Sequence, residues 1–155
     1  MDRIQVNVYS RLARQAVEHF VRQHEYLPLR EHLSPELLRQ GACFVTILEQ
    51  PGQRFRSMHG HIMPTQATLA HEIVVNTVQA LLVDPTRRAN RADLGNLRCR
   101  VALLSPLMRV SDAQHLDPSR AGVYVRSDQN KSAVLLPGRV AVETADDDPS
   151  PSSRT

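Results

Sequence analysis

Residues 42–62 read ACFVTILEQPGQRFRSMHGHI, and this stretch decides the fold. Residues 42–48 are rich in β-branched and aromatic side chains, which favour a short buried strand. Residues 50–53, Gln-Pro-Gly-Gln, then supply the glycine and proline that are typical of a turn. Residues 54–62 are therefore predicted to return as the second strand of a hairpin, and the sheet starts with an antiparallel pair.

Two amphipathic segments lie on either side of this hairpin along the chain. Residues 10–24 carry apolar side chains at helical spacing, and Ser10 is expected to cap this helix. Residues 65–83 show the same period and are predicted to form a second helix. This helix is expected to end at Asp84-Pro85, because a residue before proline is pushed out of the α region. A shorter helix is expected between Ser34 and Gly41.

The remaining pattern completes an α+β fold. Residues 97–104 alternate between apolar and arginine side chains, which predicts a half-buried strand, and residues 122–127 and 132–136 predict a second hairpin. The order of elements departs from the strict alternation of a parallel α/β sheet. We predict an antiparallel β-sheet with hairpins, packed against two main helices in a single domain over residues 1–143. Residues 144–155, TADDDPSPSSRT, are predicted to be disordered.

Composition favours a cytoplasmic protein without a membrane span. No apolar run reaches the roughly 18 residues that a spanning helix needs, and the N-terminal segment lacks the apolar core of a secretion signal. Cys43 and Cys99 show no CxxC spacing. Both are predicted to be reduced, buried thiols, and no cofactor is expected.

The two histidines at positions 59 and 61 allow two interpretations. In a strand they point to the same face, and nearby methionines would suit a soft metal such as Cu(I). Alternation predicts two sets of side chains, with Phe55, Ser57, His59 and His61 on one face and Arg56, Met58, Gly60 and Ile62 on the other. Met58 lies on the face opposite both histidines, and no acidic or cysteine ligand is adjacent, so a hydrogen-bonded core histidine at position 59 is favoured and no metal is predicted. A site at His59 and His61 is the weaker alternative.

Arginine supplies every basic side chain except Lys131. A patch that contacts phosphates would draw on six arginines in the segment 87–109, namely Arg87, Arg88, Arg91, Arg98, Arg100 and Arg109. Proteins that bind single-stranded nucleic acid also need aromatic faces on which bases stack, and aromatic residues make up only 4% of the chain. Nucleic acid is therefore a disfavoured partner.

Motifs of the common catalytic classes are missing from the sequence. The chain contains no G-x-S-x-G elbow, no HExxH helix and no phosphate-binding glycine loop. Cys43 lies in an apolar strand, where an inert structural thiol is the better interpretation. Glu72 could act as a general base with Arg56 as an anion clamp, or it could be a solvated helix residue paired with an arginine.

Several blocks of the chain, in order and spacing, resemble the AMMECR-one domain family. Residues 41–48, GACFVTIL, are similar to the family's G-C-F-V-T-L, and residues 55–62, FRSMHGHI, to its L-R-G-C-I-G segment. Residues 69–73, LAHEI, with Asn76 match L-A-x-E-I and the asparagine that follows it. The blocks continue with LDP at 116–118, GVYVRS at 122–127 and LLP at 135–137.

The resemblance implies a compact α+β domain and an association with a Memo-like protein and a radical SAM protein. It places the functional centre in a cleft near the L-R-G-C-I-G segment. In this chain Ser57 replaces the family's glycine and Met58 its cysteine, so a thiolate there is missing. The candidate cleft residues carried over are Arg56, Met58, Gly60 and Glu72.

These observations predict a divergent, C-terminally shortened member of the family. Its expected role is that of a cytosolic accessory protein that binds a small anionic ligand or a partner. The alternative is an enzyme component that acts with the Memo-like and radical SAM proteins in a modification pathway.

Overall fold

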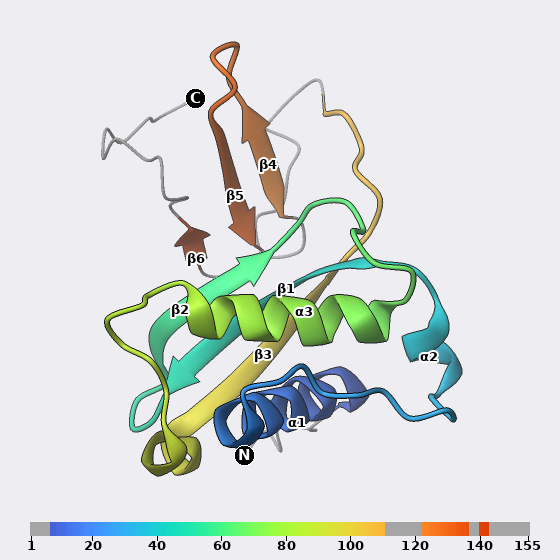
Figure 1. Cartoon of the computed structure of the whole chain (residues 1–155). Coiled ribbons are helices and arrows are strands. Elements are labelled where there is room, and N and C mark those ends of the chain that lie inside the picture. The colour runs from blue at the N-terminus through green and yellow to red at the C-terminus, as the bar shows by residue number, and fades with distance from the viewer. Residues whose placement is uncertain (1–6, 111–121, 137–139, 143–155) are drawn as a thin grey trace, which may run out of the picture. The chain divides into compact units, whose positions relative to one another are not determined.

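The computed structural model describes residues 7–110, 122–136 and 140–142, which are coloured in Figure 1. The chain divides into two compact units, residues 1–106 and residues 107–155, and each is described by itself. The expectation that residues 1–143 form a single domain stays a prediction.

A three-stranded antiparallel sheet forms the centre of the first unit. The strands are β1 (Ala42–Glu49), β2 (Arg54–Gly60) and β3 (Leu97–Leu104), in the order β2-β1-β3. Val45 on β1 pairs with His59 on one side and with Val101 on the other. The hairpin predicted from residues 42–62 is confirmed, and the strand at 97–104 completes the sheet along the other edge of β1.

Helices α1 (Val8–Gln23) and α3 (Leu69–Leu82) pack on the sheet and on each other (Figure 1). Every second residue of β1 points at them, because successive side chains of a strand point to opposite faces. Full burial of a large aliphatic side chain stabilises a fold by about 1.5–3 kcal/mol. The largest fully buried apolar side chains hold the helices to the sheet, and they are Val17, Val45, Ile47, Leu69, Ile73, Val78 and Leu97. The α+β class with an antiparallel sheet is confirmed.

Both main helices begin at residues other than those predicted. Helix α1 is capped by Asn7, whose side-chain oxygen accepts a hydrogen bond of 2.8 Å from the Ser10 backbone amide, so Ser10 lies inside the helix and is not its cap. Helix α3 begins at Leu69 after its cap Thr68, and not at residue 65. Two short helices complete this unit, α2 (Pro35–Leu38) and the 3-10 helix η1 (Arg91–Asn96).

The second unit contains a small antiparallel sheet of β4 (Val123–Arg126), β5 (Ser132–Leu136) and β6 (Val140–Val142), in the order β4-β5-β6. The predicted hairpin is confirmed as β4 and β5, and β6 was not predicted. The tail at 144–155 and the LDP block at 116–118 lie outside the described residues. No helix within the described ranges is long and apolar enough to cross a membrane.

Candidate anion-binding site

A β-bulge in the hairpin aims Arg56 at the end of β1. Ile47 pairs with Ser57, but the next residue of β1, Leu48, pairs with Phe55, so Arg56 has no residue opposite it. An extra residue of this kind breaks the alternation of side chains and re-aims one of them. The predicted alternation is therefore wrong at this point: Ser57 pairs with a core residue, whereas the Phe55 side chain is largely exposed.

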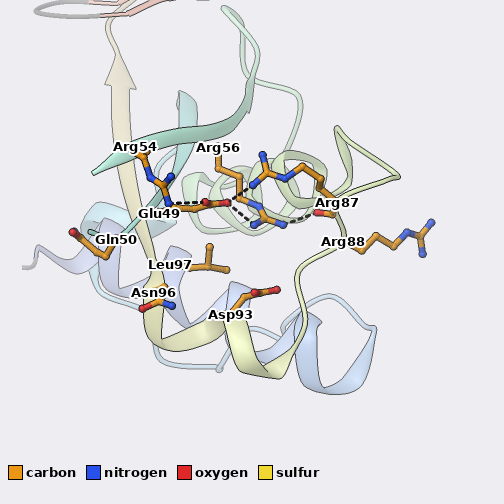
Figure 2. A pocket seen from close by; sticks show the side chains of 9 residues that line it. All are labelled: Glu49, Gln50, Arg54, Arg56, Arg87, Arg88, Asp93, Asn96 and Leu97. Atoms are coloured by element: carbon orange, nitrogen blue, oxygen red, sulfur yellow. Dashed lines mark hydrogen bonds and ion pairs between the residues drawn. The ribbon is translucent and has the colours of Figure 1, made fainter. Parts of the chain in front are cut away.

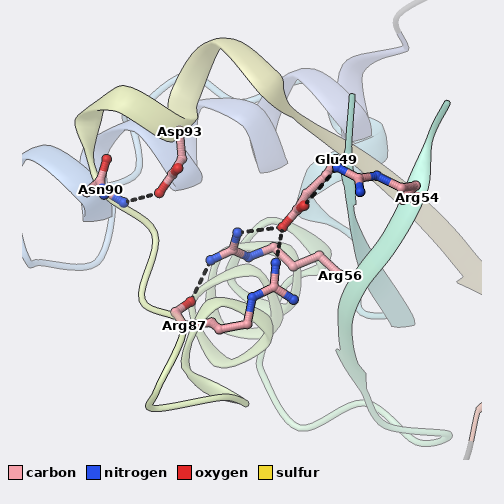
Figure 3. A network of polar contacts seen from close by, with 6 residues as sticks. All are labelled: Glu49, Arg54, Arg56, Arg87, Asn90 and Asp93. Atoms are coloured by element: carbon pink, nitrogen blue, oxygen red, sulfur yellow. Dashed lines mark hydrogen bonds and ion pairs between the residues drawn. The ribbon is translucent and has the colours of Figure 1, made fainter. Parts of the chain in front are cut away.

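The re-aimed guanidinium of Arg56 meets the carboxylate of Glu49 at the last position of β1. Arg56 donates to Glu49 Oε1 at 2.7 Å, and Arg87 donates to the same oxygen at 2.8 Å. Arg56 also donates to the backbone carbonyl of Arg87 at 2.5 Å, and Arg54 lies 3.7 Å from Glu49 Oε2. Figure 3 shows this cluster, in which one carboxylate holds three guanidinium groups.

A short turn after α3 places Arg87 beside Glu49. Asp84 Oδ1 accepts hydrogen bonds from the amide of Thr86 at 2.9 Å and from its hydroxyl at 2.6 Å, and the Arg87 amide donates to the Asp84 carbonyl at 3.3 Å. The Thr86 hydroxyl and amide hold the pKa of the Asp84 carboxyl below its usual value. Aspartate followed by proline is typical of such turns, so the local sequence explains this one.

The helix η1 forms the opposite side of the site. Asn90 and Asp93 cap it reciprocally, since the Asn90 amide donates to Asp93 Oδ2 at 2.7 Å and the Ala92 amide donates to Asn90 Oδ1 at 2.8 Å. Arg14 of α1 fixes the end of η1 by donating to the backbone carbonyls of Leu94 and Leu97. The position of η1 is therefore held both locally and by the neighbouring helix.

Between these elements lies a pocket of about 290 Å³, which we call the arginine pocket. Figure 2 shows its lining residues, which are Glu49, Gln50, Arg54, Arg56, Arg87, Arg88, Asp93, Asn96 and Leu97. Four arginines and two carboxylates line the pocket, and the cluster of Arg54, Arg56 and Arg87 on Glu49 carries two positive charges in excess. Arg88 lies at the rim and points away from the other arginines, and its side chain has no ion pair among the described residues.

The predicted cleft residues separate in the structure. Arg56 lines the arginine pocket, whereas Met58, Gly60 and Glu72 do not. Met58 is buried in β2 and pairs with Thr46. Gly60 lies against β1, where a Cβ atom would stand 2.4 Å from the Cys43 carbonyl oxygen, so its role in this unit is close backbone packing. Whether any of the three contacts a ligand stays a prediction.

Glu72 is fully buried in the first turn of α3. Its carboxylate accepts hydrogen bonds from the amide of Thr65 at 2.9 Å, the hydroxyl of Thr65 at 2.9 Å and the amide of Gln66 at 2.8 Å. These bonds hold residues 65 and 66 in a loop, which is why α3 begins later than predicted. The alternative of a solvated Glu72 paired with an arginine is wrong.

His59 is the hydrogen-bonded histidine that the strand pattern favours. Its Nδ1 lies 3.1 Å from Asn76 Oδ1, and the buried Asn76 donates through Nδ2 to the Cys43 carbonyl at 3.2 Å. Burial lowers the pKa of His59, and the bond to Asn76 opposes this shift. The ring of exposed His61 lies 5.1 Å from that of His59. Among the described residues no group of three or more metal-binding side chains occurs.

Both cysteines are free thiols, but only Cys43 is buried as predicted. Cys43 is fully buried, and burial raises its pKa to about 11. Cys99 is half-buried, and burial raises its pKa to about 12. Since the thiolate is the reactive form, neither thiol is suited to nucleophilic chemistry at neutral pH.

Sequence reasoning missed Glu49, Arg54 and Arg87 as site residues. A signal for two of them was present, because a glutamate and two arginines flank the turn of the predicted hairpin at positions 49, 54 and 56. Arg87 enters the sequence analysis only within the disfavoured phosphate-contacting patch of six arginines, of which Arg87 and Arg88 line the arginine pocket and Arg98 and Arg100 do not. Arg98 instead donates to the backbone carbonyls of Gly95 and Leu97.

The helix-covered sheet and its arginine pocket define an α+β protein with a small polar cavity. Residues 10–151 match the AMMECR1 family, and the chain belongs to that family. A Thermotoga maritima protein is 31% identical over 141 residues, which cover 90% of this chain and 80% of that protein. The crystal structure of an uncharacterized protein from Pyrococcus horikoshii is similar at a TM-score of 0.72 and 22% identity, over 83% of this chain and 67% of that one. The last similarity bears on the fold alone.

Proposed function

We propose that this member of the AMMECR1 family is a cytosolic binding protein whose arginine pocket holds a small anionic ligand. The observation that carries the proposal is the charge on one side of the pocket, where three guanidinium groups share a single carboxylate, Glu49. Arginine offers its donors in a planar fork that matches carboxylate and phosphate groups. Two arginines in this lining, Arg54 and Arg87, are exposed enough to meet a ligand that enters from solvent.

The geometry of the cluster also supports binding over catalysis. Glu49 is engaged by Arg56 and Arg87 through one oxygen, so it is not placed as a free general base. The remaining carboxylate, Asp93, caps η1. We therefore assign these side chains to holding and orienting an anion.

Isothermal titration with inorganic phosphate tests the proposal. Arg87→Ala should weaken binding by about tenfold, since charge-assisted hydrogen bonds contribute about 1.5–3 kcal/mol. The control is Arg100→Ala, which also removes one exposed arginine but lies outside the pocket lining. An equal loss in both variants, or no saturable binding of phosphate or of carboxylates such as citrate by the wild-type protein, would contradict the proposal.

A second candidate function follows from membership of the family. The chain would act as a component of a modification pathway, together with a Memo-like protein and a radical SAM protein. Co-purification of the three proteins after co-expression, and turnover that needs all three, would support this candidate. If the partners neither bind this chain nor depend on it for turnover, the candidate is excluded.

A further inference from the structure

We infer that the ligand of the arginine pocket is a phosphorylated sugar or polyol. Its phosphate would lie against the guanidinium groups, and its hydroxyl-bearing, non-aromatic body would lie against the wall formed by Gln50, Asp93 and Asn96. This inference rests on the proposed function and adds the chemical class of the ligand.

The charge of the pocket selects the phosphate. The cluster of three arginines on Glu49 carries two positive charges in excess, and a phosphate monoester carries about −1.5 to −2 at pH 7. A single carboxylate carries only one negative charge and would leave the cluster positive. The Arg56 side chain is only 10% exposed, whereas those of Arg54 and Arg87 are 68% and 57% exposed, so the last two guanidinium groups are the ones available to phosphate oxygens.

The opposite wall offers both donors and acceptors for hydroxyl groups. In Figure 2, Asn96 and Asp93 lie across the pocket from the cluster of Glu49 with its arginines. Asp93 uses Oδ2 to accept from the Asn90 amide, and its other oxygen accepts no hydrogen bond within the described ranges. Hydroxyl groups donate to carboxylates and exchange hydrogen bonds with amides in either direction. Gln50 adjoins this wall, since its backbone amide donates to the Asn96 carbonyl at 2.7 Å. One carboxylate and two side-chain amides therefore suit a polyol.

The same lining disfavours nucleotides. Bases bind by stacking on aromatic side chains, and the nine lining residues include no aromatic side chain and only one apolar one, Leu97. The volume of about 290 Å³ lies just below the roughly 300–1,000 Å³ of small-molecule sites. A phosphorylated sugar fits these limits better than a nucleotide or a dinucleotide cofactor.

Separate calorimetric titrations with four probes test the inference. The probes are inorganic phosphate, glycerol 3-phosphate, glucose 6-phosphate and adenosine monophosphate, measured by calorimetry at one low salt concentration. At least one of the two polyol phosphates should bind about tenfold tighter than inorganic phosphate, because several hydroxyl hydrogen bonds of modest strength are added. Adenosine monophosphate should bind no tighter than the better polyol phosphate.

Variants of the opposite wall separate the body of the ligand from its phosphate. The Asn96 side chain is exposed and makes no hydrogen bond within the described ranges, so Asn96→Ala should leave the fold intact. We expect Asn96→Ala and Gln50→Ala each to weaken binding of the polyol phosphate by about 3- to 10-fold and to leave binding of inorganic phosphate unchanged. Thermal unfolding of each variant checks that the fold is retained.

The outcomes distinguish this inference from the proposed function. If phosphate binds and depends on Arg87, but neither polyol phosphate binds more tightly than phosphate, the inference fails and the anion site stands. If adenosine monophosphate binds more tightly than both polyol phosphates, the inference also fails. If none of the four probes binds, both the inference and a phosphate site are overturned.

Discussion

Replacing Glu49 by glutamine should lower the stability of the protein and raise its affinity for anions at the same time. Glu49→Gln keeps the size of the side chain and removes the negative charge that Arg56 and Arg87 share. The side chains of Arg56 and Glu49 are only 10% and 18% exposed, so their ion pair is poorly screened. The buried guanidinium loses its charged partner and keeps only neutral acceptors, the Arg87 carbonyl and the glutamine amide oxygen.

The structure sets the size of the loss in stability. Breaking a fully buried pair costs about 3–5 kcal/mol. Both partners here keep some contact with water, so a loss of about 1.5–3 kcal/mol in the free energy of unfolding is expected, which is the range for hydrogen bonds to charged groups. The matched control is Arg54→Gln, because Arg54 lies 3.7 Å from Glu49 and is 68% exposed. An exposed pair of this kind is expected to contribute less than about 0.5 kcal/mol.

The effect of Glu49→Gln on binding has the opposite sign. For each negative charge on an anion roughly 5 Å from the carboxylate, with an effective dielectric constant of about 40–80, the lost repulsion amounts to about 0.8–1.7 kcal/mol. Inorganic phosphate carries at least one such charge at neutral pH, so its affinity should rise by at least about 4-fold at low salt, and the gain should shrink as salt is added. Urea denaturation measures the stability, and calorimetry measures the binding. A weaker affinity in folded Glu49→Gln would refute the reasoning, because Glu49 would then hold the arginines in place for the ligand more than it repels it.

Three further predictions concern the hairpin. Gly60→Ala should destabilise the protein by about 1–3 kcal/mol or more in urea denaturation, because its Cβ would stand 2.4 Å from the Cys43 carbonyl oxygen, whereas Gly95→Ala, with nothing within 4 Å, should be close to neutral. Cys43, with a pKa raised to about 11, should resist alkylation at about pH 8 until the protein is unfolded; rapid labelling of the native protein would contradict its burial. The pKa of His59 is lowered, so the unfolded chain takes up the proton more readily, and stability should fall as the pH drops below about 6.5. When the pH is lowered from about 7.5 to 5.5, the melting temperature of His59→Gln should therefore fall less than that of the wild type. The melting temperature of the control His32→Gln, at an exposed position, should fall as much as that of the wild type.

Local sequence patterns predicted the main elements of the first unit but not all their ends. The period of the apolar residues marked α1, α3 and the strands, because burial of one face is what each element requires. The start of each helix depends on which polar side chain accepts hydrogen bonds from the free backbone amides of the first turn. In the folded chain these side chains are Asn7 for α1 and Thr68 for α3. Glu72 accepts hydrogen bonds from the amides of residues 65 and 66 and so keeps them in a loop before α3. A loop has no repeating pattern of apolar residues, so the sequence pattern did not predict it.

The sequence also predicted some features of the candidate site but not others. The resemblance to the family segment singled out Arg56, and a hydrogen-bonded histidine was predicted at position 59 because the family motif carries an apolar residue in that slot. It also predicted a buried, unreactive thiol at Cys43, because a thiol within an apolar strand lies away from water.

Only the tertiary structure decided which charges meet. The bulge at Arg56 turns its side chain toward Glu49, and the turn after α3 brings Arg87, 38 positions beyond Glu49, to the same carboxylate oxygen. Asp93 and Asn96 reach the pocket because η1 is fixed against α1 by Arg14. Sequence determines what each segment buries, because burial repeats at short range along a helix or a strand. The pocket arises where the ends of several segments converge, and that convergence depends on packing between residues far apart in the chain.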